Sequence, residues 1–197
     1  MSRSSESHKA AARSLADSET ILVWDWPLRV WHWTLALLVL IAWFTPNRHD
    51  RVHRFAGYAV IGLLLFRLVW GFIGTRHSRF HRLRSRLRAA PAFLRNVCRG
   101  RTGRYLGLNP AGVAMMASLL LMLCVSALTG AMQVTVQFFG VWWVEDTHVY
   151  ASDAVLILIV LHVAGVAVVS RIQRDNLTRA MITGRKRLSK RMNAAPS

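Results

Sequence analysis

The sequence predicts an all-α integral membrane protein, a four-helix bundle with both termini in the cytoplasm. The first observation is that the 197-residue chain is 53% hydrophobic and gathers its apolar residues into long runs. The second is that its basic residues lie mainly on one side of these runs. Each run approaches the ~20 residues that a helix needs to cross a ~30 Å hydrocarbon core. The expected spans cover about 29–46, 53–75, 110–132 and 148–170.

The start of the first span carries an aromatic belt, formed by Trp24, Trp26, Trp31 and Trp33. Tryptophan is enriched at the membrane–water interface, so this cluster marks where the chain enters the bilayer. Pro27 suits the first turn of a helix, where its missing N–H costs nothing. The membrane domain is therefore expected to start at residue 24.

The membrane domain is expected to cover residues 24–171, and the segments on either side of it are polar. Residues 1–23 contain no apolar stretch of the kind found in a cleavable signal, so we expect a cytoplasmic tail. Residues 172–197 are expected to form a basic cytoplasmic tail.

Charge distribution sets the orientation. Residues 76–108 hold ten Arg and no acidic residue, and 171–197 hold six Arg and two Lys against one Asp. The connector 133–147 holds Glu145 and Asp146 and no basic residue. Basic loops stay in the cytoplasm, which predicts a multi-pass protein of the bacterial inner membrane with its basic loop and tails inside.

The net charge of +17 also bears on partners. Contact with anionic membrane lipid explains basic loops beside apolar spans better than nucleic-acid binding does. Arg48, Arg51 and Arg54 fall on the opposite side from the other basic residues. They could attract an anion or meet lipid phosphates, and both interpretations stand.

Ionisable side chains in or at the edge of a span are costly and indicate function. Three of the eight histidines, His8, His77 and His81, lie in polar segments and are expected to be solvated surface residues. The other five lie at or within the apolar runs: His32, His49, His53, His148 and His162.

Four of these histidines fall at two levels when their depth in the membrane and their angle around the helix axis are considered. His148 and His162 are separated by 14 positions, which is ~21 Å along a helix and only ~40° short of four full turns. With helices alternating in direction, His53 shares the outer level with His148, and His32 shares the inner level with His162. His49 is the alternative to His53, one turn earlier, but it sits in a polar loop.

Two imidazoles at each level fall short of the four ligands of a structural zinc site. Iron in a porphyrin needs two axial ligands, and a four-helix bundle can host the flat apolar ring. Neither Cys98 nor Cys124 belongs to a C-x-x-C-H attachment motif, so the haems would be non-covalent. Four glycines could admit the ring or serve close helix packing, and both interpretations stand: Gly57, Gly62, Gly130 and Gly165.

Five stretches between residue 23 and about 187 carry a family resemblance: "VWDWPLRVWHW", "HRFAGYAVIGLLLFRLVWGFIG", "GLNPAGVAMM", "ALTG" and "LHVAGVAVVSRIQRDNLTRAMITGRKR". In order and spacing they resemble the bacterial cytochrome b561 family, which includes the b-type cytochrome subunits of nickel–iron hydrogenases. The resemblance implies two haem b groups bound by His32, His53, His148 and His162. It also implies electron transfer between quinone and a partner such as a cytochrome c or a dehydrogenase.

Arg67 lies 14 residues after His53, hence near the inner level. It could bind a haem propionate or extend to the cytoplasmic interface, and both remain open. Arg29 and Arg171 are weaker candidates for the same role. The connector "FFGVWWVED" could cap the outer haem or form an aromatic belt.

Three function classes compete. A di-haem electron-transfer cytochrome is the leading hypothesis, either alone or as the cytochrome subunit of a hydrogenase or another dehydrogenase. A stand-alone oxidase that reduces quinone, for instance with superoxide as donor, is the enzymatic alternative. A non-redox membrane scaffold with structural histidines is the third.

Overall fold

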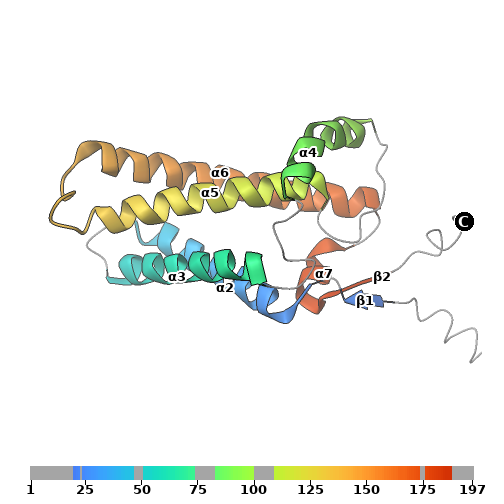
Figure 1. Cartoon of the computed structure of the whole chain (residues 1–197), viewed down its shortest axis with the longest axis horizontal. Coiled ribbons are helices and arrows are strands. Elements are labelled where there is room, and N and C mark those ends of the chain that lie inside the picture. The colour runs from blue at the N-terminus through green and yellow to red at the C-terminus, as the bar shows by residue number, and fades with distance from the viewer. Residues whose placement is uncertain are drawn as a thin grey trace, which may run out of the picture.

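Four long helices dominate the protein in a computed structural model (Figure 1). The structure describes residues 20–22, 24–46, 51–73, 83–99, 109–173 and 176–187. Within these ranges, four helices are long and apolar enough to cross a membrane, as the sequence predicted. They are α2 (Trp26–Phe44), α3 (Arg51–Ile73), α5 (Pro110–Met132) and α6 (Trp142–Gln173).

Local signals explain where the spans begin. Pro27 lies in the first turn of α2, directly after the N-cap residue Asp25. At α5, the Asn109 side chain accepts a hydrogen bond of 2.6 Å from the Gly112 N–H, and Pro110 occupies the first turn. Both starts satisfy or remove N–H groups that would otherwise lack a partner at a helix end.

The long helices pack mainly in two neighbouring pairs, α5 with α6 and α2 with α3, and α3 also contacts α5. Ser126 on α5 and Ser152 on α6 share a hydrogen bond of 2.8 Å between their hydroxyls. Large apolar side chains such as Leu37, Phe72 and Ile157 remain exposed. Lipid solvates such side chains, so this surface suits a bilayer rather than water.

Three of the four spans differ from the expected bounds. The helix α2 covers Trp26–Phe44, against the expected 29–46. The helix α6 begins at Trp142, six residues before the predicted start at 148, because the chain turns between Gln133 and Val141. Trp142 and Trp143 therefore belong to the first turn of α6 and not to a separate connector cap. The helix α3 begins at Arg51 and ends at Ile73, against the expected 53–75.

Four elements outside the spans were not predicted from the sequence. The helix α4 (Leu83–Cys98) lies in the basic loop, and α7 (Leu177–Thr183) lies in the basic C-terminal segment. The strands β1 (Thr20–Leu22) and β2 (Arg185–Arg187) pair antiparallel, so the fold is not purely α-helical. Apolar periodicity cannot reveal three-residue strands, because their partner lies at the far end of the sequence.

The β1–β2 pair and its neighbours form a clasp between the two ends of the membrane domain. The Trp24 N–H donates to the Gly184 carbonyl at 3.2 Å, and Arg29 Nη1 donates to the Ile182 carbonyl at 2.6 Å. Gly184 adopts φ 76°, and an added Cβ there would lie 2.9 Å from the Trp24 carbonyl oxygen. Figure 1 shows the clasp and α7 at one end of the bundle and the α5–α6 turn at the other.

Candidate functional site: two histidine pairs

The bundle brings the four span histidines together in two pairs. The ring centroids of His53 and His148 are 6.2 Å apart, with an angle of 84° between the rings. Those of His32 and His162 are 6.3 Å apart, at 59°. We name these the turn-end pair and the tail-end pair, after the α5–α6 turn and the clasp. The other four histidines, His8, His49, His77 and His81, lie outside the described residues.

Backbone carbonyls hold both rings of the turn-end pair. His53 Nδ1 lies 3.0 Å from the Ala42 carbonyl oxygen, and His148 Nδ1 lies 2.8 Å from the Ser126 carbonyl oxygen. A carbonyl oxygen can only accept, so each Nδ1 must carry the proton and donate it. In a neutral imidazole, the lone pair then resides on Nε2. Metal-binding histidines are typically oriented by such a second hydrogen bond.

Gly130 makes room for one of these rings. An added Cβ would lie 2.9 Å from Cε1 and 3.1 Å from Nδ1 of His148. At Gly57, Gly62 and Gly165, an added Cβ would meet no atom within 4 Å. Gly130 therefore contacts an imidazole, a role that the sequence analysis did not anticipate.

The tail-end pair lies among aromatic side chains. Trp33 meets His32 edge-on, with ring centroids 5.5 Å apart. The neighbouring Trp31 donates from Nε1 to the Leu63 carbonyl at 2.7 Å, which ties α2 to α3. No hydrogen bond to a carbonyl such as those of the turn-end pair is recorded for His32 or His162 among the described residues.

Arg67 is buried within the bundle and does not extend to the interface. It is only 5% exposed, and its Cζ lies 5.9 Å from the centre of the Trp31 ring, within cation–π range. Its Nη2 donates to Met116 Sδ at 3.7 Å. The contact with Trp31 places a guanidinium beside the residue that precedes His32.

The tail-end pair borders a groove on the protein surface. A groove of about 400 Å³ opens between the start of α2 and α7. Arg29 lines it, with its Nε buried and without a hydrogen-bond partner among the residues that the structure describes. Trp33, which touches His32, lines it as well. The remaining lining residues are Trp26, Val30, Thr34 and Ile182.

The ring separations suit two imidazoles on opposite sides of one metal ion. A metal–nitrogen bond of ~2.0 Å plus ~1.2 Å from nitrogen to ring centre places two opposed ring centres ~6.4 Å apart. The angle between the rings is unrestricted, because each can rotate about its metal–nitrogen bond. Within the described part of the chain, no group of three or more His, Cys, Asp or Glu could hold a metal. The donor set at each level is therefore a pair, which fits haem iron.

The family model for prokaryotic cytochrome b561 matches residues 23–184. The chain belongs to the prokaryotic cytochrome b561 family. The family resemblance predicted from the sequence is thus confirmed. As a cytochrome b561, the protein is a multi-pass bacterial membrane protein of the b-type cytochromes, which bind b-type haem and transfer electrons. Searches of curated proteins and of solved structures return no match.

Some contacts of this cytochrome b561 could not have been found from its sequence. The carbonyls of Ala42 and Ser126 orient the turn-end imidazoles, but every residue carries a carbonyl. Ile182 reaches the groove from α7 through a chain reversal that periodicity does not encode. For Gly130 the sequence did carry a signal, since glycine in a span often marks where another group approaches the helix backbone closely.

Proposed function

We propose that this cytochrome b561 binds two non-covalent haem b groups, one at each histidine pair. His53 and His148 would supply the axial ligands of one haem, and His32 and His162 those of the other. The observation that carries the proposal is the spacing of both pairs, 6.2 and 6.3 Å between ring centroids. The two Nδ1–H···O=C bonds of the turn-end pair support it, because they leave Nε2 free to bind a metal.

The chain's own residues determine what such a centre can do. Each bound haem supplies one-electron chemistry through the ferric and ferrous states of its iron. Two histidines held to each haem iron would leave the metal no open position for a substrate, which favours electron transfer. Both levels share α6, where His148 and His162 lie ~21 Å apart along the helix. The pairs therefore define a route for electrons across the membrane.

Arg67 is proposed to bind a propionate of the tail-end haem. Its guanidinium is buried beside Trp31 and carries five N–H donors in a planar fork. Carboxylates pair well with the planar fork of an arginine.

Quinone is the proposed membrane-borne partner, and the groove beside the tail-end pair is its proposed site. An apolar headgroup there would lie against Trp33, which is in edge contact with His32. The buried Arg29 Nε offers a donor for a quinone oxygen. Trp33→Ala in reconstituted protein should slow quinone-dependent haem oxidation while leaving the haem content at two per chain. Unchanged rates would place the quinone elsewhere.

A second candidate function is oxidation of superoxide with quinone as acceptor. Arg51 and Arg54 are both exposed in the first turn of α3, where His53 also lies, and would attract a small anion. A cytochrome c or dehydrogenase partner would use the same end of the bundle. The two candidate functions are distinguished by supplying the purified protein with superoxide and ubiquinone, since only the oxidase reduces quinone without a protein donor.

The orientation is proposed with the clasp end in the cytoplasm, in the inner membrane of a bacterium. The β1–β2 pair joins the two ends of the membrane domain and so supports placing both on one side. The basic loop and the basic C-terminal segment favour the cytoplasm for that side. A reporter inserted within 84–104 should signal cytoplasm, and one near Glu145 should signal periplasm. The opposite pattern would reverse the orientation but leave the pairs unchanged.

Haem content tests the whole proposal. The purified protein should release two haem b groups per chain into acidified organic solvent, as measured by a pyridine haemochrome assay. A yield of one haem or none per chain would contradict the two-haem assignment.

A further inference from the structure

The helix α4 (Leu83–Cys98) has a surface that the proposed electron transfer does not use. It lies in a segment, residues 76–108, that contains ten Arg and no acidic residue. It packs against α5 at the clasp end of the bundle, with Ala90 and Phe93 each only 6% exposed. A cationic helix is thereby fixed to the flank of a membrane-spanning helix.

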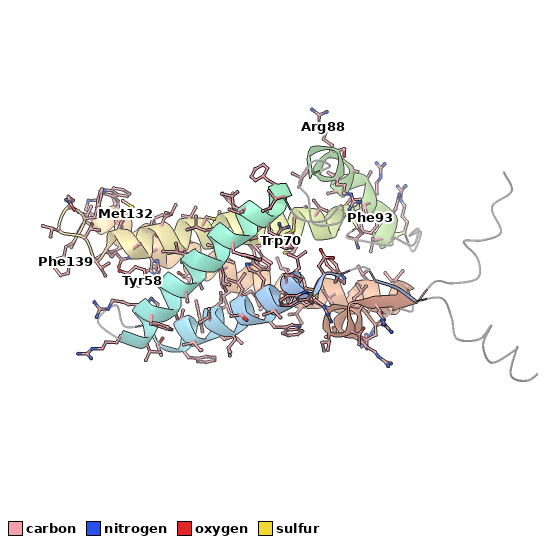
Figure 2. The ribbon with its side chains drawn as sticks, turned by 60° about the horizontal axis from the view of Figure 1, so that its bottom comes forward. Tyr58, Trp70, Arg88, Phe93, Met132 and Phe139 are labelled. Atoms are coloured by element: carbon pink, nitrogen blue, oxygen red, sulfur yellow. The ribbon has the colours of Figure 1, made fainter. Side chains whose placement is uncertain are left out.

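Three stripes run along α4. At 100° per residue, Arg88, Arg95 and Arg99 fall within ~40° of one another, and all three are exposed. Leu87 and Leu94 form a second stripe ~100–120° away, and they are 36% and 52% exposed. Ala90 and Phe93 form the third, buried stripe. Figure 2 shows Arg88 projecting away from the bundle, whereas Phe93 lies on the side facing it.

We propose that α4 is an interfacial helix that binds the phosphate headgroups of anionic phospholipid. Leu87 and Leu94 would enter the acyl boundary, and Arg88, Arg95 and Arg99 would hold the phosphates beside it. An exposed apolar stripe next to a basic stripe is the pattern of helices that lie in the membrane interface. Arginine suits this role, because its planar fork donates two hydrogen bonds to one phosphate.

The position of α4 favours a lipid over a soluble acidic partner. The helix packs against α5 at the end where that span begins (Figure 1), which would place its exposed leucines at the edge of the bilayer. A nucleic acid or an acidic protein would satisfy the arginines but leave the leucine stripe in water. A lipid satisfies both stripes at once. The inference needs only the membrane fold and does not depend on haem content.

The test compares lipid binding to the detergent-solubilised holoprotein by native mass spectrometry. The probes are phosphatidylglycerol and phosphatidylcholine with identical chains. Each arginine near anionic headgroups is worth about a fivefold gain in affinity. Arg88→Gln with Arg95→Gln should therefore weaken phosphatidylglycerol binding by at least about tenfold and leave phosphatidylcholine unchanged. The haem spectrum of each variant verifies the fold.

A matched control removes the same charge elsewhere. Arg51→Gln with Arg54→Gln deletes two exposed arginines at the opposite end of the bundle. This double variant should weaken phosphatidylglycerol binding by less than about threefold. Equal losses in both double variants would show that net charge, not α4, sets the preference, and would overturn the proposal. Equal losses for both lipids in the α4 variant would also overturn it.

The leucine stripe and the rival ligands complete the test. Leu87→Ser with Leu94→Ser should weaken both lipids alike, because it removes acyl contact without removing charge. No effect on either lipid would overturn the interfacial placement. Millimolar inorganic phosphate, a polyglutamate peptide and a short oligonucleotide should fail to displace phosphatidylglycerol. Displacement by any of them that depends on Arg88 and Arg95 would assign the stripe to that ligand class instead.

Discussion

The turn-end and tail-end pairs have nearly equal ring separations, 6.2 and 6.3 Å, but are held by different interactions. Backbone carbonyls accept from both imidazoles of the turn-end pair. The tail-end pair instead lies among aromatic rings, with the buried Arg67 guanidinium near Trp31. The same proposed ligand, histidine, is thus placed in two electrostatic settings, and such a difference would separate the redox potentials of two bound haems.

The direction of that separation follows from charge. A hydrogen bond donated from Nδ1 makes an imidazole a stronger electron donor, which favours ferric iron and lowers the potential. A buried cation disfavours the extra positive charge of ferric iron and raises the potential. We therefore expect the tail-end haem to be the one with the higher potential.

Replacing a ligand should have the largest effect and tests whether the pairs are separate sites. His53→Ala or His148→Ala should convert only the turn-end haem to a high-spin or water-bound form, because one imidazole remains. His32→Ala or His162→Ala should do the same only to the tail-end haem. Electron paramagnetic resonance of oxidised membranes, combined with a redox titration, resolves the two low-spin signals. Identical partial losses in all four variants would contradict the pairing.

The same series decides between His53 and its alternative. His49→Ala should leave both signals intact. If His49→Ala removes the signal that His148→Ala removes, while His53→Ala spares it, then His49 is the ligand.

Gly130→Ala should perturb the turn-end haem selectively. The new Cβ would lie 2.9 Å from His148 Cε1, so the ring must move and its bond to the Ser126 carbonyl must weaken. Loss of a hydrogen bond that orients a metal ligand typically costs 10–100-fold in affinity, so we expect about that loss of haem retention at this pair. Gly62→Ala, where a Cβ meets no atom within 4 Å, is the control. Haem stoichiometry after gel filtration gives the answer, and equal haem content in both variants would refute the steric argument.

Arg67→Gln should lower the redox potential of the tail-end haem and reduce the difference between the potentials of the two haems. Removing one buried positive charge at moderate effective dielectric corresponds to about 1–2 kcal/mol, or roughly 40–90 mV for a one-electron couple. Arg67→Lys keeps the charge and should restore most of the difference. An optical redox titration measures both values. A shift of the turn-end haem instead would show that Arg67 acts on the other pair.

Ser152→Ala should have the smallest effect and alter neither potential by more than about 10 mV. It removes the Ser126–Ser152 hydrogen bond between α5 and α6 without touching an imidazole. Hydrogen bonds between membrane helices average about 0.6 kcal/mol, so the loss should appear only as a slightly lower thermal stability. A potential shift as large as that of Arg67→Gln would mean that helix packing, and not local charge, separates the pairs.

Much of this architecture could be predicted from the sequence, because its signals are periodic. Hydropathy gave the four spans, and the 14-residue interval from His148 to His162 placed both on one face of α6. Haem ligation by these residues stays a prediction. The burial of Arg67 was left undecided, because an arginine near the end of a span can extend outward as easily as inward.

What could not be predicted depends on contacts between distant segments. The start of α6 at Trp142 depends on where the turn after Gln133 closes, which composition does not reveal. The helix α4 was not predicted, because its short amphipathic pattern lies within a loop that is dominated by arginines. The clasp joins segments at the two ends of the domain, so no local pattern encodes it.

The clasp has a consequence for the order of events during synthesis. Chains emerge from the ribosome N-terminal end first, so α2 is made long before β2 and α7 exist. The meeting of His32 with His162 waits for α6, and the pairing of Ile21 with Lys186 waits for β2, which is made later. A chain that ends before α6 therefore lacks the tail-end histidine pair, and one that ends before β2 cannot close the clasp, so closure follows completion of the four spans.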